Sequence, residues 1–332
     1  MAATVYGDIT PRINLHAVAE FLARLQPMLV LNRFGQQYVM PMKQTRTPVW
    51  RRYLPLALAT TELNELETPA AQKLTSEDVQ GYLRKFASIV EESEEIEHFH
   101  NDNIPPQVMQ LMAEQAAQTV ERLVYERLLS GTNQRFTNGA AISAVNTPIT
   151  LAFQRGVERV FGRNDARPFT SGLVSSPNYE TQPIEAAYFA VCHPDMANDI
   201  RGMTNFINVR HYQTQAWENE LGSVDGVRYM MSTAIAPIRS AGGVPGSMVS
   251  TNGLDADVYP IFYFAKNAFA VCSLRGMSGS GVGGVSVYRI PRQPTIANPL
   301  GDRSAYVWKL YHDTVILDDA CMVIGFSAAT NL

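Results

Sequence analysis

An acidic segment with two histidines is the first place where side chains could carry out chemistry. Residues 91–102 contain five glutamates together with His98, His100 and Asp102. Carboxylates and imidazoles are common metal ligands, so a divalent-metal site is one interpretation. The spacing matches no compact ligand motif, and runs of charge usually lie on a solvated surface. A solvated turn ahead of a helix is the favoured interpretation, and we assign no metal ligand.

Two further motifs are typical of catalysis or cofactor binding. Cys192 and His193 could form a nucleophile and its base, but neighbours on an extended strand point to opposite faces. Residues 279–284 (GSGVGG) match the dinucleotide fingerprint, which works only where a strand turns into a helix. Here a strand-like segment follows. The sequence therefore predicts no catalytic residue and no cofactor, and we expect a protein that is not an enzyme.

A basic and aromatic segment is the strongest candidate for binding. Its residues are Lys43, Arg46, Trp50, Arg51, Arg52 and Tyr53. Such a mixture can bind single-stranded nucleic acid by stacking and charge. It can also form a β-arm that lies across a neighbouring subunit, where the arginines pair with acidic residues. The formal net charge of −4 and the lack of a wider basic surface favour the subunit contact.

This segment is predicted to belong to a long β-hairpin. Residues 43–53 are rich in β-forming types, and residues 57–76 resemble a loop. Tyr82, Phe86 and Val90 would share one face of a strand within 79–90, although their spacing of four also fits a helix. A hairpin of about 45 residues far exceeds the usual short connections between strands, so it is expected to have a function of its own.

Three helices of more than ten residues are predicted. The clearest covers 106–129, because Pro105 and Pro106 precede it and Ser130-Gly131 is a good stop signal. At about 1.5 Å per residue it would be about 36 Å long. An amphipathic helix is expected from Pro11 to about residue 26, and another at 151–164 with Thr150 as its cap.

The remainder reads as several strands and loops. The apolar segment 186–192 is predicted to be a strand, and a short helix follows it to about Met203. Further strands are expected at 227–234, 258–265, 268–274, 285–290, 305–313 and 315–327. The predicted fold class is therefore α+β, with a long helix and two extended arms.

The composition indicates a surface that is buried against other chains. Charged residues make up 17% of the 332 residues, against about 25% in typical soluble proteins. Five of the 27 basic residues are lysines and the other 22 are arginines. Protein interfaces favour arginine, although a GC-rich genome explains the bias equally well. Apolar runs fall far short of the roughly 20 residues of a membrane-spanning helix. Three scattered cysteines indicate free thiols in a reducing cell.

Several segments together resemble a known family. They are residues 5–12, 49–53, 114–123, 144–152, 187–195 and 217–222. With these segments in this order, the chain resembles the major capsid proteins of the N-four-like phage group, which have the Hong Kong 97-type capsid fold. The resemblance is weakest after about residue 276.

The resemblance implies a division of the chain into four parts. Residues 1–40 would be an N-terminal arm, and 41–90 an extended β-hairpin called the E-loop. A peripheral P domain with a long spine helix would take 91–185 and 291–313. An axial A domain would take 186–290 and 314–332. No counterpart is expected for the cleaved N-terminal scaffolding segment of some relatives.

The implied function is that of a major capsid protein of a tailed bacteriophage. It would assemble into hexamers and pentamers of an icosahedral head, form in the host cytoplasm and stay in the virion. Its partners would be other copies of itself, the portal, and scaffolding or decoration proteins. Double-stranded DNA would be enclosed without sequence-specific binding, and no membrane is involved. One alternative is an encapsulin-like shell around a cargo protein. The other is a metal-dependent enzyme using residues 91–102.

Overall fold

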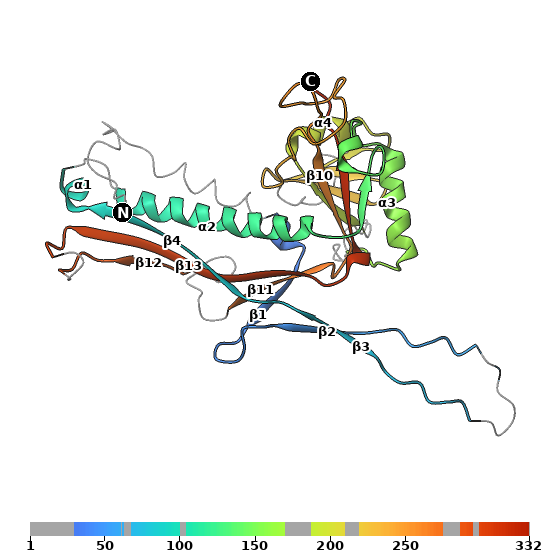
Figure 1. The fold of residues 1–332 in the computed structure, drawn as a ribbon, viewed down its shortest axis with the longest axis horizontal. Coiled ribbons are helices and arrows are strands. Elements are labelled where there is room, and N and C mark those ends of the chain that lie inside the picture. The colour runs from blue at the N-terminus through green and yellow to red at the C-terminus, as the bar shows by residue number, and fades with distance from the viewer. Residues whose placement is uncertain are drawn as a thin grey trace, which may run out of the picture.

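The computed structural model describes residues 30–60, 62, 68–99, 104–169, 187–209, 219–274, 286–294 and 299–331. The molecule is elongated (Figure 1). A long helix and a ribbon of strands form one end, a compact part with a sheet and two helices forms the other, and a thin hairpin projects from the junction. An elongated molecule exposes more surface to solvent than a compact molecule with the same number of residues.

The first sheet has five strands, and its long strand β13 organises the other four. The order is β1 (Gln36–Met40), β11 (Phe269–Leu274), β13 (Arg303–Ile316) and β12 (Ser286–Ile290), with β4 (Arg84–Ser93) also paired to β13. β4 runs antiparallel to β13 from Arg303↔Ser93 to His312↔Arg84. β12 and β11 pair with successive parts of β13. A single continuous strand thus joins the far end of the ribbon to the compact part.

Helix α2 (Ile104–Leu129) covers one face of this sheet. Residues along β13 alternate between buried and half-buried, as expected when only one face of a strand is packed. Tyr306, Trp308 and Leu310 are buried, and the Trp308 indole N–H donates to the Gln115 side-chain oxygen at 3.0 Å. The helix predicted at 106–129 is confirmed, with its end at Leu129.

The second sheet has seven strands and forms the compact part. Its order is β5 (Gln134–Phe136), β14 (Met322–Ser327), β10 (Tyr259–Phe264), β6 (Tyr188–Cys192), β9 (Val227–Met231), β8 (Glu220–Val224) and β7 (Ile207–Asn208). β10 is antiparallel to both β14 and β6, whereas β6 and β9 are parallel. Every residue of β10 and β14 is buried, because both faces of this sheet are covered.

Helix α3 (Leu151–Arg163) packs on the outer face of the second sheet. The Phe153 N–H donates to Thr150 Oγ1 at 3.3 Å, so Thr150 is the cap that the sequence predicts. The other helices are α1 (Glu94–Phe99) and α4 (Ala197–Arg201). Short 3-10 turns are η3 (Leu31–Arg33), η4 (Ile142–Ala144), η5 (Pro194–Met196) and η8 (Asp319–Cys321). No described helix has both the length and the apolarity needed to cross a membrane.

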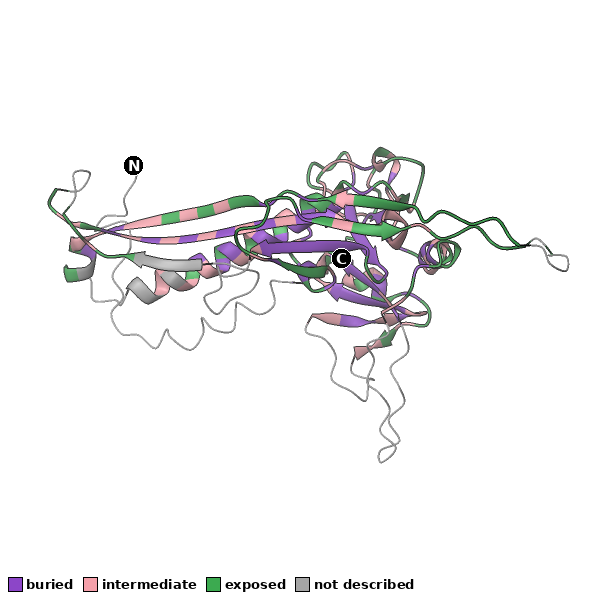
Figure 2. Ribbon diagram, turned by 90° about the horizontal axis from the view of Figure 1, so that it is seen from below, coloured by how far each residue is buried: buried purple, intermediate pink, exposed green. Residues whose placement is uncertain are grey.

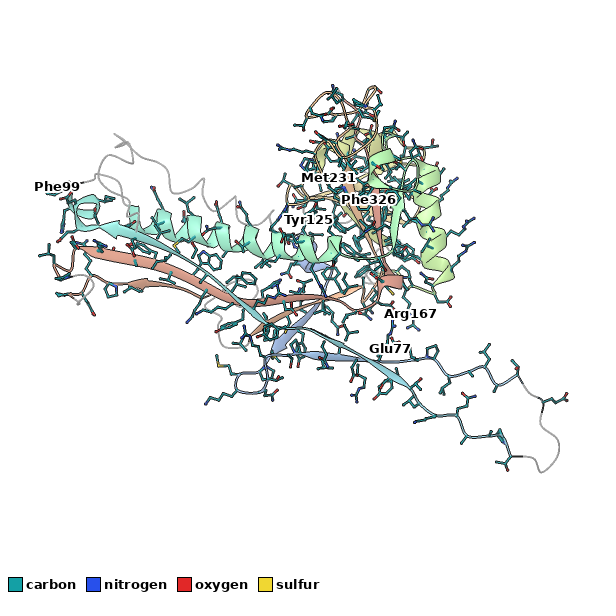
Figure 3. All side chains as sticks on the ribbon, in the orientation of Figure 1. Glu77, Phe99, Tyr125, Arg167, Met231 and Phe326 are labelled. Carbon is teal, nitrogen blue, oxygen red and sulfur yellow. The ribbon has the colours of Figure 1, made fainter. Side chains whose placement is uncertain are left out.

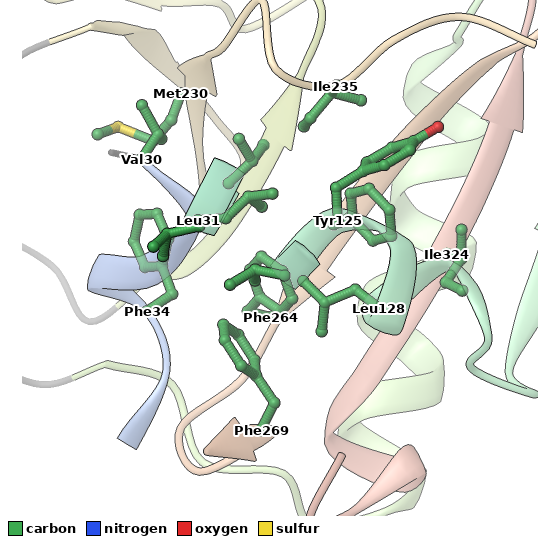
Figure 4. Close-up of a cluster of buried hydrophobic side chains, with 14 of the residues drawn as sticks. Val30, Leu31, Phe34, Tyr125, Leu128, Met230, Ile235, Phe264, Phe269 and Ile324 are labelled. Carbon is green, nitrogen blue, oxygen red and sulfur yellow. The ribbon is translucent and has the colours of Figure 1, made fainter. Parts of the chain in front are cut away.

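Two hydrophobic cores lie on opposite faces of the second sheet. One contains Val157, Phe161 and Tyr263 beneath α3. The other joins both sheets to α2 and η3, and it includes Phe34, Leu128, Phe264, Phe269 and Ile324 (Figure 4). Figure 2 shows the buried residues concentrated in these two layers, whereas most of the hairpin is exposed. Because one core is shared, α2 and the two sheets form a continuous body.

Most of the predicted strands are present, with two corrections. The segment 315–327 is not one strand: β13 runs on to Ile316, the turn η8 follows, and β14 begins at Met322. The segment 79–90 is split between β3 (Ser76–Gln80) and β4, because Gly81 is in close contact with Asp313 and Trp50 and interrupts the strand. The helix predicted at 11–26 and the glycine-rich segment 279–284 lie outside the described residues.

Candidate intersubunit contact site

The projecting hairpin consists of β2 (Val49–Tyr53) and β3. The two strands are antiparallel, with Trp50 opposite Val79 and Arg52 opposite Glu77. The last ladder bond is donated by the Leu54 N–H to the Thr75 carbonyl at 3.0 Å. Beyond it both arms continue away from the body with their side chains in solvent (Figure 3). The predicted hairpin is confirmed, although β2 starts at Val49 and not at residue 43.

The outer part of the hairpin carries exposed leucines. Leu56, Leu58 and Leu74 are 56%, 87% and 59% exposed. Large apolar side chains lose favourable burial energy when they remain in water, about 25 cal/mol for each Å². A group of exposed leucines on a projecting arm is typical of a surface that is buried against another protein.

The two faces of the hairpin base have different environments. Directly paired residues of antiparallel strands lie on the same face, so Arg51 with Asp78 and Arg52 with Glu77 lie on opposite faces. Arg51 donates two hydrogen bonds to the Asp78 carboxylate, both at 2.8 Å. This bond lowers the pKa of Asp78. Tyr53 lies on the Arg51 face and is 59% exposed, so this face is open to a partner.

Trp50 anchors the hairpin to the body. It packs against a small cluster of buried side chains, Met40, Leu83 and Cys272, and its ring meets Tyr38 edge to face at 5.8 Å. At Gly81 a Cβ atom would collide with the Asp313 carboxylate and approach the Trp50 ring to 3.1 Å. The glycine therefore permits the close approach of the hairpin to the sheet.

Replacement of Trp50 tests this anchor. Trp50→Ala removes a half-buried ring from the cluster, and we expect it to lower the free energy of unfolding by about 2 kcal/mol. Tyr53→Ala, the exposed neighbour, is the matched control and should change it by less than about 0.5 kcal/mol. Urea unfolding of the unassembled subunit measures both. Equal losses would contradict the anchoring role.

The other predicted contact residues divide between the body and solvent. Arg46 Nε donates to the Leu83 carbonyl at 2.8 Å, and its guanidinium lies 4.4 Å from the centre of the Tyr82 ring. Lys43 is exposed, in a turn with a φ of 63°. Arg52 pairs with Glu77 at 2.8 Å and with Asp318 of the body at 2.5 Å. Arg46, Trp50 and Arg52 therefore hold the hairpin, whereas Lys43, Arg51 and Tyr53 lie on its open surface.

A groove of about 580 Å³ lies where the hairpin meets α2 and β13. Its lining includes Gly81, Arg84, Arg127 and Asp313. The Tyr82 N–H donates to Asp313 at 2.7 Å, which fixes the chain between the hairpin and β4. His312, also in the lining, is buried, and burial lowers its pKa to about 4. The groove thus belongs to the structural junction at the base of the hairpin.

Comparison with known proteins identifies the family to which this architecture belongs. A model of the phage capsid protein family matches residues 76–325. The chain belongs to the phage capsid protein family. As a capsid protein it is a structural component of the virion. No curated protein sequence matches the chain.

Solved structures share the fold of this capsid protein at low sequence identity. The capsid of Ralstonia phage GP4 is 10% identical, with 100% of this chain and 99% of that chain aligned and a TM-score of 0.70. The cyanophage Pam1 capsid asymmetric unit is 11% identical over 99% and 98%, with a TM-score of 0.62. The SrpI encapsulin complex from Synechococcus elongatus PCC 7942 is 13% identical over 94% and 95%, with a TM-score of 0.54. The predicted Hong Kong 97-like α+β fold is confirmed.

The acidic segment of the capsid protein is partly structured, unlike the predicted solvated turn. Its first residues end β4, where Glu92 is buried, and the next form α1. The Glu94 carboxylate forms an ion pair with the Arg292 guanidinium at 3.3 Å. The same carboxylate oxygen lies 3.1 Å from His98 Nε2. His100 and Asp102 lie outside the described residues. Within the described part, no three histidine, cysteine, aspartate or glutamate side chains lie close enough together to hold a metal ion.

The Cys192-His193 pair of the capsid protein has a structural role. Cys192 is buried, which raises the pKa of its thiol and disfavours the reactive thiolate. His193 Nδ1 accepts a hydrogen bond from the Asp195 N–H at 3.3 Å and caps η5. The thiol of Cys192 points instead toward Met231 and the Met230 carbonyl.

Sequence reasoning missed the body residues of the junction. Asp313 and Asp318 receive the hairpin, yet they lie near the C-terminus and far from it in the chain. A single carboxylate at the end of a strand carries no local signal of a distant partner. Only the pairing of β13 with β4 brings these residues beneath the hairpin.

Proposed function

We propose that this chain is the major capsid protein of a tailed phage, which assembles into the hexamers and pentamers of an icosahedral head around double-stranded DNA. The observation that carries the proposal is the projecting hairpin with exposed leucines, on a chain of the phage capsid family. A lone subunit gains nothing from such an arm. A shell gains buried apolar area at every neighbour.

The proposal keeps the division into four parts. The N-terminal arm takes 1–40 and the E-loop takes 41–90, which includes β2 and β3. The P domain takes 91–185 and 291–313, with α2 as its spine helix. The A domain takes 186–290 and 314–332, which includes most of the second sheet. The chain would accordingly cross between P and A domains near the end of β13.

The open face and the outer part of the hairpin are the proposed contact surface. Tyr53 and the three leucines would supply apolar area, and Lys43 and Arg51 would supply charge. Head-to-tail contacts of this kind close into rings around a symmetry axis. Many weak contacts act together in a closed shell, so each arm needs only a modest affinity.

The proposed partners follow from the same function. Other copies of the chain form the capsomers, and a portal and scaffolding or decoration proteins complete the head. The order of the sequence motifs supports membership of the N-four-like group. Enclosed DNA needs no specific site, which is consistent with a net charge of −4. The proposed subunit is structural and not enzymatic.

A cargo shell is the second candidate function. The likeness in fold to the SrpI encapsulin complex favours it. Such a shell would use the same subunit contacts around a packaged protein. The contents of isolated particles separate the two: nuclease-protected DNA supports the phage head, and a co-purifying enzyme supports the cargo shell.

The direct test is to express the full chain alone and measure its mass. We expect capsomers or shells, seen as assemblies of hundreds of kilodaltons to megadaltons by light scattering and electron microscopy. The matched condition is the same protein in about 1 M salt, where exposed charge pairs are screened and apolar contacts persist. A folded monomer at all concentrations, alone and with scaffolding protein, would contradict the proposal.

A further inference from the structure

Arg52 makes contacts on both sides of the boundary between hairpin and body. Within the hairpin it pairs with Glu77 across the ladder at 2.8 Å. Its other guanidinium nitrogen lies 2.5 Å from Asp318 of the body. Among the hydrogen bonds and ion pairs of the described residues, none between hairpin and body lies closer to the tip. One side chain thus ties the projecting arm to the two-sheet body.

Asp318 is held in a fixed position. It lies two residues after the end of β13, and its N–H donates to the Ala268 carbonyl at 3.2 Å. Its Oδ1 accepts from the Ala320 N–H at 3.0 Å and caps η8, the turn that leads into β14. β13 belongs to the first sheet and β14 to the second. The carboxylate that receives Arg52 therefore sits on the connection between both sheets.

The hairpin has two separate points of attachment. The inner point is the base, where Trp50 packs in its cluster and the Tyr82 N–H bonds to Asp313. The outer point is Arg52 with Asp318. A single attachment would let a two-stranded ribbon pivot, because an isolated hairpin has no layer packed on it. A second attachment further out removes that freedom.

Small rotations at the base have large effects at the tip. The seven residues from Leu54 to Thr60 span about 23 Å when extended. A rotation of about 10° then moves Thr60 by about 4 Å. The exposed leucines lie on this segment and on the returning arm. Such a displacement is enough to remove an apolar side chain from its contact on a neighbour.

We propose that Arg52 is a positioning residue: its ion pair with Asp318 sets the direction in which the hairpin leaves the body. The inference rests on the proposed function, since direction matters because the hairpin must reach a neighbouring subunit. The pair is partly exposed, with side-chain exposures of 44% and 29%. It therefore biases direction and is not required for folding.

Arg51 provides a matched control. It has the same side chain, lies on the next position of the same strand, and makes the corresponding cross-strand pair with Asp78. Its described ion pair stays within the hairpin. Arg51→Gln and Arg52→Gln therefore remove equivalent ladder contacts, and only the second removes a contact with the body.

The experiment measures the direction of the hairpin in the full-length subunit. Spin labels are attached to Ala71→Cys on the hairpin and to Ala152→Cys on α3. Double electron–electron resonance spectroscopy then measures the distance between the two labels. Cys321 is replaced by Ser, and Cys192 and Cys272 are buried. Labelled protein is diluted in unlabelled protein, so that distances between subunits do not contribute. Asp318→Asn removes the charge and keeps an oxygen to cap η8.

We expect Asp318→Asn and Arg52→Gln to broaden the distance distribution and shift its mean by at least about 4 Å. Arg51→Gln should leave it unchanged, and Arg52→Lys should restore most of the native distribution at low salt. An unchanged distribution in Asp318→Asn, or an equal change in Arg51→Gln, overturns the proposal. Failure of the unmutated chain to form particles, both alone and with scaffolding protein, would overturn the proposed function, and this distance measurement would still decide the role of Arg52.

Discussion

A subunit without the outer part of its hairpin is expected to fold and to fail in forming shells. The design replaces residues 55–74 by Asn-Gly, a two-residue turn that suits antiparallel strands. It joins Leu54 to Thr75, the last bonded pair of the ladder. The replaced residues contact the body through no described bond, so the free energy of unfolding should change by less than about 1 kcal/mol.

The measurement compares closed particles by electron microscopy with subunit stability by urea unfolding. We expect closed particles to fall by at least about tenfold, since each shell repeats the lost contact many times. The control retains the full length and changes Leu56, Leu58 and Leu74 to Ser. It should weaken assembly in the same direction, because the apolar area is removed and the backbone is kept. Normal particles from the shortened chain would disprove the role of the arm.

The sequence predicted the elements with strong local signals. Pro105 and Pro106, which lie in the first turn of α2, and Gly131 after it marked both ends of the helix, and Thr150 marked the start of α3. The apolar strands β6, β10 and β11 were recognisable because a strand buried on both faces is apolar at every position. These features depend only on neighbours in the chain.

Features that depend on distant contacts could not be predicted. The break at Gly81 exists because Asp313 and Val315 approach there, and no local residue signals a strand end. The candidate site shows the same limit. Six residues of one basic segment formed a single set by type, yet the structure divides the four that lie on β2 according to which face of the strand meets the body. Face assignment requires the partner strand and the body, neither of which local patterns specify.

Glu121 shows how a buried polar residue can hide in a helical pattern. It lies on α2 among residues typical of a solvated helix surface, yet it is completely buried. Its two carboxylate oxygens accept hydrogen bonds from the N–H groups of Leu31 and Asn32, both at 3.1 Å. These residues begin η3, near the start of the described part of the chain. Glu121 thus joins η3 to α2.

Removal of this carboxylate is expected to have the largest effect on stability of any single substitution considered. Glu121→Ala leaves two buried N–H groups without an acceptor and should lower the free energy of unfolding by about 3 kcal/mol. Glu126→Ala is the control, because Glu126 lies on the same helix, is 57% exposed and pairs only with Arg122 within the described contacts. Its loss should be below about 1 kcal/mol.

Glu121 also gives the subunit a defined pH dependence. Burial raises its pKa from 4.5 to about 7, although the bonds from Asn32 and Leu31 and the charge of Arg33 oppose the rise. Between these two values the folded state holds a proton that the unfolded state has released. Folding therefore takes up a proton, and stability falls as pH rises from about 4.5 to about 7. At 1.36 kcal/mol for each pKa unit, the contribution over this range is about 3 kcal/mol.

Glu121→Gln isolates this contribution, because the amide has the shape of the carboxyl group and does not titrate. The difference in unfolding free energy between the Gln variant and the unmutated subunit should increase by about 3 kcal/mol in favour of the variant from pH 4.5 to 7. Above about pH 7 the difference should become constant. Urea unfolding of the unassembled subunit at a series of pH values measures it. A difference that does not vary with pH would mean that the pKa of Glu121 is the same in the folded and unfolded states, so that burial does not raise it.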